Sequence, residues 1–135
     1  MYSQFNKKQI GEIGELVAAE YYLNKGYALL FKNWRWSNKG ELDLILYNQD
    51  DDILVICEVK TRKTGALING VYSVNKNKQT KIRMLSYVFI QKHKFYEKSN
   101  VRFDVADLIF NTITGKIDQI TIFENAFWHI YIIEI

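Results

Sequence analysis

Charged residues alternate with apolar ones inside two strand-like segments, and this pattern restricts the fold more than any other feature of the chain. The segments read Gly40-Glu41-Leu42-Asp43-Leu44-Ile45-Leu46 and Ile53-Leu54-Val55-Ile56-Cys57-Glu58-Val59-Lys60. Side chains two positions apart on a strand project from the same face. Glu41 therefore shares a face with Asp43, and Glu58 shares one with Lys60. If the two strands lie side by side, the carboxylates and the amine converge on one spot.

Such a cluster needs a partner, because unpaired charges are costly to bury. Hard cations such as Mg²⁺ or Mn²⁺ prefer carboxylate, carbonyl and water oxygens. Asp43, Glu58 and the backbone carbonyl of Val59 would supply such a set, with Lys60 placed to orient an attacking water. Each piece also has an ordinary interpretation, since a Glu-x-Lys pair is commonly a solvated ion pair and a lone Asp commonly caps a turn. Metal-dependent phosphodiester cleavage is the leading hypothesis from the pattern.

Length and composition predict one globular unit. The chain has 135 residues, of which 48% are hydrophobic and 24% charged. No apolar run reaches the ~18 residues of a membrane span, and the N-terminus lacks the apolar core of a signal peptide. The single cysteine, Cys57, excludes an intrachain disulfide and fits a reducing, cytoplasmic compartment, where we expect it as a buried, inert thiol. The net charge of +3 permits nucleic-acid binding without requiring it.

The order of the expected elements indicates the architecture. We expect helices over residues 8–24 and 75–97, strands over 27–36, 42–47, 53–60, 101–110 and 116–123, and an apolar, β-prone end over 127–135. Ile10, Ile13, Val17 and Tyr21 should form the buried stripe of the first helix, and Gly26 should end it. In the second helix the buried stripe should contain Ile82, Leu85, Val88, Phe89 and Phe95. This order predicts an α/β fold with helices flanking a mixed sheet.

Seven short blocks in a fixed order resemble one known family. They are Gly14-Glu15, Asn33-x-Arg35, the Gly40 to Ile45 segment, Glu58-Val59-Lys60-Thr61-Arg62, the set Val74, Lys78 and Ile82, Arg102-Phe103-Asp104-Val105, and Asn125-Ala126-Phe127. Together they resemble the YraN-like family of uncharacterised bacterial proteins, which belongs to the PD-(D/E)XK, or restriction-endonuclease-like, nuclease superfamily. The resemblance runs from Gly11 to Phe127. The superfamily's proline before the aspartate is replaced by Leu42.

The resemblance implies a fold, a site and a cofactor. The fold would be a restriction-endonuclease-like three-layer core in one domain over residues 1–135, with the core at about 8–127 and an apolar extension at 128–135. The catalytic residues would be Asp43, Glu58 and Lys60, with Glu15 of the first helix as a fourth member near the metal. The cofactor would be Mg²⁺ or Mn²⁺, and the substrate would be DNA, including branched or single-stranded forms.

Basic residues near the expected site are candidates for phosphate contacts. They are Arg62, Lys63, Lys78, Lys81 and Arg35. An ordinary solvated helix face is an equal alternative for the lysines, although Lys78 matches the family's lysine position. Trp34 and Trp36 would stack on unpaired bases or, as we expect for at least one of them, pack in the core. His93, His129 and the acidic turn at Asp50-Asp51-Asp52 lack metal-ligand spacing, and we expect no site there.

Three classes of function stay open at this point. The first is a metal-dependent DNA endonuclease, and the second is a catalytically silent nucleic-acid-binding module with the same fold. The third is a structural or partner-binding protein whose apolar C-terminal segment forms an oligomer, and a homodimer is the oligomer that we expect. The joint presence of Asp43, Glu58, Lys60 and Glu15 favours the enzyme, because a silent domain has no need of the complete set.

Overall fold

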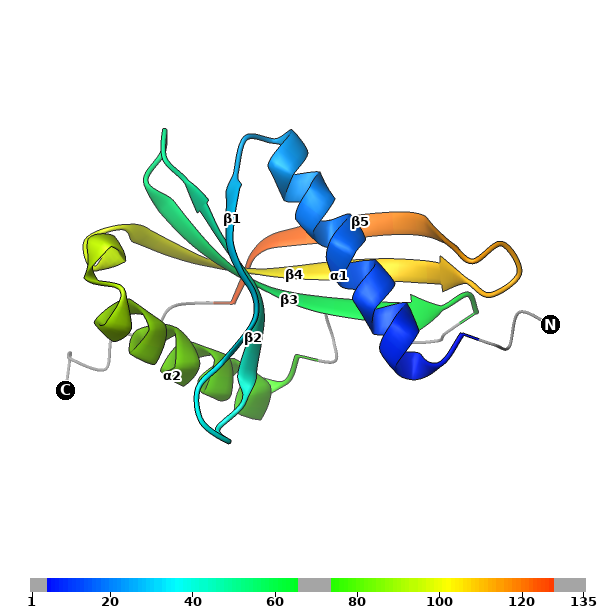
Figure 1. Cartoon of the computed structure of the whole chain (residues 1–135), viewed down its shortest axis with the longest axis horizontal. Coiled ribbons are helices and arrows are strands. Elements are labelled where there is room, and N and C mark those ends of the chain that lie inside the picture. The colour runs from blue at the N-terminus through cyan, green and yellow to red at the C-terminus, as the bar shows by residue number, and fades with distance from the viewer. Residues whose placement is uncertain (1–4, 66–73, 128–135) are drawn as a thin grey trace.

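A computed structural model describes residues 5–65 and 74–127 of the chain (Figure 1). The elements are α1 (Lys7–Asn24), β1 (Ala28–Arg35), β2 (Glu41–Asn48), β3 (Ile53–Lys63), α2 (Lys76–Lys92), the short 3₁₀ helix η3 (Lys94–Tyr96), β4 (Asn100–Asn111) and β5 (Lys116–Phe127). The five strands form one sheet in the order β1-β2-β3-β4-β5. Neighbouring strands are antiparallel except for β3 and β4, which are parallel, and α2 makes the crossover between them.

The two helices cover opposite faces of this mixed sheet. Alternate residues of β3 divide between two apolar clusters, with Val55 and Cys57 on the α1 side and Leu54 and Ile56 on the α2 side. Burial of both faces explains why β3 reads as a continuous apolar run. Figure 1 shows α1 crossing the sheet, where it contacts β3, β4 and β5. The expected fold class is confirmed: the sheet between two helices is a three-layer α/β core of the restriction-endonuclease-like kind.

Helix α1 begins and ends close to the expected positions, but its buried face is shifted by one residue. Asn6 caps its start together with Gln9, and Gly26 follows its end with φ 90°. Besides Ile10, the buried residues are Gly14, Ala18, Ala19 and Tyr22, whereas the expected Ile13, Val17 and Tyr21 are half-buried. The physical reason is the short distance between α1 and β3. A Cβ at residue 14 would overlap Oγ1 of Thr61, so only glycine fits at this point of the face.

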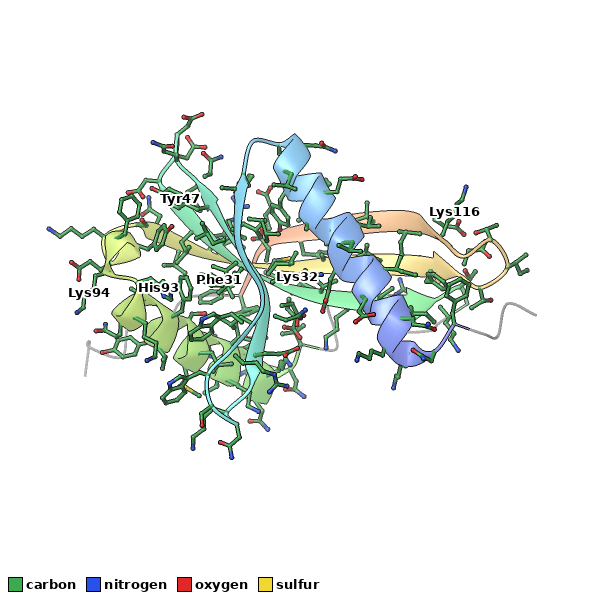
Figure 2. All side chains as sticks on the ribbon, viewed as in Figure 1. Phe31, Lys32, Tyr47, His93, Lys94 and Lys116 are labelled. Atoms are coloured by element: carbon green, nitrogen blue, oxygen red, sulfur yellow. The ribbon has the colours of Figure 1, made fainter. Side chains whose placement is uncertain are left out.

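Helix α2 is shorter than expected. It ends at Lys92, and the expected continuation to residue 97 is wrong, because His93 adopts φ −131° and ψ 73° and the chain then turns through η3. The His93 ring stacks on Phe89 at 4.1 Å and lies beside Phe31 of β1 (Figure 2). Phe95 is 78% exposed, so its expected place in the buried stripe is also wrong, while Ile82, Leu85 and Phe89 are buried as expected.

Strand β5 is longer than expected and extends to Phe127. Phe127 is buried and stacks on Phe103 of β4, with the ring centroids 5.0 Å apart. The rest of the expected apolar extension, residues 128–135, lies outside the described residues. Among the residues that the structure describes, no helix is long and apolar enough to cross a membrane.

Candidate active site

The two predicted carboxylates lie next to each other where β2 and β3 separate. The ladder between these strands ends at the pair Leu44–Cys57, so Asp43 and Glu58 are the next residues in register. Beyond this pair, a side chain takes the place of the backbone hydrogen bonds between the strands: Oδ2 of Asp43 accepts a hydrogen bond from the Val59 N–H at 2.8 Å. The hairpin therefore places a carboxylate pair and the Val59 backbone at one point, as the alternating pattern predicts.

Burial and the neighbouring Glu58 carboxylate raise the pKa of Asp43 from 3.8 to about 8, against the opposing effect of the Val59 N–H. Like charges that share a buried site disfavour joint ionisation, and a cation between them reverses that effect. A positive charge beside Asp43 would therefore stabilise the ionised form of the carboxylate pair. Its donor chemistry, two carboxylates beside a backbone carbonyl, fits a hard divalent ion.

Two lysines approach the Glu58 carboxylate, which is only 4% exposed. Lys60 Nζ lies 3.3 Å from Glu58 Oε2, and Lys78 Nζ lies 3.3 Å from the same oxygen. Lys60 follows Glu58 on β3, whereas Lys78 reaches over from the first turn of α2, which Asn75 caps. From the sequence, Lys78 was a candidate for phosphate contacts at the rim of the site. The structure places its ammonium in the carboxylate cluster itself.

Glu15 lies at the edge of the cluster. Its Oε1 accepts a hydrogen bond from Asn33 Nδ2 at 3.2 Å. Burial raises the pKa of Glu15 while the Asn33 amide lowers it, and the Glu15 charge adds to the raised pKa of Asp43. Within residues 5–65 and 74–127, no three Asp, Glu, His or Cys side chains form a group that could hold a metal. The charges of Glu58 and Glu15 both act on Asp43, and the assignment of these three carboxylates and the Val59 carbonyl as metal ligands stays a prediction.

Asn33 lies beside the candidate site, and the sequence indicated this residue only through the family resemblance. It lies between the register pairs Lys32–Leu44 and Trp34–Leu42, so it faces Asp43 across the β1–β2 ladder. Its φ is 57°, which is uncommon for a residue other than glycine and is often found where a side chain has a special task. Asn33, Asp43 and Glu58 thus form a row across β1, β2 and β3.

The remaining basic candidates have different surroundings. Arg62 is held by the buried Asp107, with its Nε 3.1 Å from Oδ1 and its Nη2 3.2 Å from Oδ2. Arg35 pairs with Glu41 at 3.2 Å, and the Glu41 charge contributes to the raised pKa of Glu15. Lys63 and Lys81 are exposed. The structure therefore brings Lys60 and Lys78 to the site, fixes Arg62 on β4, and leaves Lys63, Lys81 and Arg35 facing solvent.

Two of the blocks that carry the family resemblance, Arg102 to Val105 and Asn125 to Phe127, hold the strands around the site, a role that the sequence analysis did not assign to them. Asp104 of β4 is fully buried and accepts hydrogen bonds from the Tyr22 hydroxyl at 2.6 Å, from Arg102 at 2.9 Å and from the Asn125 N–H at 2.9 Å. This network links α1, β4 and β5. Cys57 is buried, and burial raises the pKa of its thiol, in agreement with the expected inert role.

Two further features lie apart from the site. Trp34 and Trp36 pack against the apolar cluster under α2, which confirms core packing for both. A groove between α1 and the start of β5 is lined by Ile13, Val17, Ile117 and Ile120 and contains none of the candidate residues. Lys116, at the rim of this groove, is labelled beside the β4–β5 turn in Figure 2.

The sheet, the covering helices and the carboxylate pair with its lysine define the class: an α/β protein with a restriction-endonuclease-like core and an Asp…Glu-x-Lys cluster at its separating strands. The chain belongs to the uncharacterised protein family UPF0102, the YraN-like family, whose model matches residues 14–108.

Relatives of this family cover most of the chain. It is 37% identical over 120 residues to a UPF0102 protein of Clostridium botulinum (strain 657 / Type Ba4), covering 89% of this chain and 94% of that relative. It is 39% identical over 121 residues to one of Alkaliphilus oremlandii, covering 89% and 98%, and 35% identical over 100 residues to one of Streptomyces coelicolor, covering 74% and 75%.

Proposed function

We propose that this protein is a metal-dependent endonuclease that hydrolyses phosphodiester bonds of DNA in the cytoplasm, with branched or single-stranded DNA among its substrates. One observation carries the proposal: Asp43 and Glu58 lie side by side where the ladder between β2 and β3 ends, with the Lys60 ammonium 3.3 Å from Glu58. Carboxylates gathered so closely in a largely buried place weaken the fold unless a cation joins them.

The residues would divide the work as follows. Asp43, Glu58 and the Val59 carbonyl would hold Mg²⁺ or Mn²⁺, which supplies Lewis-acid charge for the phosphate when bound. The Val59 N–H fixes the Asp43 carboxylate through a 2.8 Å hydrogen bond, so this ligand is positioned before the ion arrives. Lys60 would orient the attacking water and stabilise negative charge that develops on the phosphate. Attack at phosphorus breaks the ester bond and leaves a phosphate monoester and a free hydroxyl.

A catalytically silent nucleic-acid-binding module is the second candidate. The observation in its favour is that Lys60 and Lys78 already neutralise Glu58 without a metal. Such a protein would still bind DNA through its basic residues, and its binding would weaken as salt rises.

The deciding experiment incubates the protein with linear, flapped, single-stranded and four-way-junction DNA, in Mg²⁺, in Mn²⁺ and in chelator. We expect cleavage that needs the divalent ion and that is lost in Asp43→Asn and strongly slowed in Lys60→Ala. Binding without cleavage under every condition favours the silent module. Equal cleavage by the wild type and both variants would indicate a contaminating nuclease and refute the assignment.

A further inference from the structure

Two ammonium groups from different elements contact the same oxygen of Glu58. Lys60 Nζ and Lys78 Nζ each lie 3.3 Å from Oε2, although the carboxylate itself is buried. One ammonium is enough to neutralise the single charge of Glu58. The second adds positive charge beside Asp43, which is the charge that a divalent ion would supply there.

A divalent ion on Glu58 would compete with these ammonium groups, because cations within a few ångströms of one another repel strongly in a partly desolvated site. Lys60 is two residues from Glu58 on the same strand, and its side chain is 33% exposed. Lys78 belongs to a separate helix, and its side chain is 38% exposed. Lys78 is the more exposed of the two and belongs to another element, so its departure to solvent leaves Lys60 and Glu58 paired on β3.

The surroundings of Lys78 favour an anion as its next partner. The first turn of α2 contains no acidic residue, and Lys76 lies in the same turn. Lysines near a helix N-terminus are opposed by the helix dipole, so their ammonium groups gain from a nearby negative charge. Glu58 meets that need in the metal-free protein, and a phosphate of DNA would meet it once Glu58 is occupied.

We propose, on the basis of the nuclease function above, that Lys78 takes the place of the divalent ion on Glu58 and moves to the substrate phosphate when the ion binds. The metal and DNA then favour the same arrangement, with Lys78 away from Glu58. Each ligand raises the affinity for the other, because the coupling between two binding sites is reciprocal.

The test measures Mn²⁺ affinity by isothermal titration in the absence of DNA. Lys78→Met removes the competing ammonium and keeps the apolar stem, so Mn²⁺ should bind about tenfold more tightly than to the wild type. Lys76→Met, an exposed control on the same turn, should change the affinity less than about twofold. Lys78→Gln should have the same effect as Lys78→Met. Agreement between the two variants would exclude misfolding of one of them as the cause.

A second measurement follows DNA affinity in Ca²⁺, an oxygen-seeking ion of the same charge, and in chelator. For the wild type, Ca²⁺ should strengthen DNA binding, and for Lys78→Met this gain should fall about tenfold. If Lys78 only contacted phosphate from the protein surface, its replacement would weaken DNA binding without any change in Mn²⁺ affinity. The opposite signs of the two effects therefore identify the exchange.

Three results would overturn the inference. Unchanged or weaker Mn²⁺ binding by both Lys78 variants would show that the ammonium does not compete with the ion, while the nuclease proposal would stand. An undiminished Ca²⁺-dependent gain in DNA affinity would show that the released lysine does not reach the phosphate. Failure of the wild type to bind Mn²⁺, with or without DNA, would refute the metal-dependent function and this inference together.

Discussion

The carboxylate pair should lower the stability of the metal-free protein, and Asp43→Asn should remove this destabilisation. Burial and the Glu58 carboxylate raise the pKa of Asp43 from 3.8 to about 8. Between these values the folded protein holds a proton on Asp43 that the unfolded chain has lost. The free energy of unfolding therefore falls as pH rises from about 4 to about 8 and levels off above that.

The size of the effect follows from the shift. A change of about four pKa units corresponds to a ceiling of about 6 kcal/mol, at about 1.4 kcal/mol per unit. Relaxation and water entry reduce the cost of a buried charge, so we expect about 2 kcal/mol at pH 8.5. Asparagine keeps the volume, can still accept the Val59 N–H with its carbonyl, and can donate its amide towards Glu58. The variant should thus be more stable than the wild type by about this amount at pH 8.5 and similar to it near pH 4.

Urea unfolding in chelator at several pH values between 4 and 8.5 measures the difference. Asp50→Asn, in the exposed turn between β2 and β3, is the control and should follow the wild type throughout. Added Mn²⁺ should stabilise the wild type much more than Asp43→Asn, because only the wild type retains both carboxylates. Parallel stability curves for Asp43→Asn and wild type across this pH range would refute the reasoning.

Gly14→Ala should destabilise the protein by about 2 kcal/mol in urea unfolding because its Cβ overlaps Thr61, whereas Gly11→Ala, with open space in the same helix, should be neutral or stabilising. Asn33→Gly keeps the positive φ but removes the side chain that contacts Glu15. If that side chain positions Glu15, this variant should lower kcat/KM about as much as Asn33→Ala does. Activity retained by the glycine variant alone would mean that Asn33 has only a backbone role. Lys81→Ala should lower DNA affinity and reduce the salt slope by about 1, and an unchanged slope would place this side of α2 away from DNA. Removal of residues 128–135 should shift a dimer to a monomer in sedimentation, and a monomeric full-length protein would refute the dimer proposal.

The site was predictable where it depends on neighbours in sequence. The two-residue period of strands and the short connection between β2 and β3 suffice to place Asp43 beside Glu58 and to put Lys60 next to them. The contribution of Lys78 was not predictable in this form. It requires the parallel pairing of β3 with β4, for which α2 must cross the sheet and bring its first turn to Glu58.

The sequence by itself determined the element order and the α/β class, because hydrophobic periodicity, turn residues and helix caps are local signals. Tertiary packing decided three features that no local signal contains. Close contact with Thr61 selected glycine at position 14 of α1, and the contact of the His93 ring with Phe31 of β1 accompanied the early end of α2. The register of β1 against β2 set Asn33 opposite Asp43. Each of these depends on a distance between residues of different helices or strands, and such a distance exists only once the sheet and its two helices have packed together.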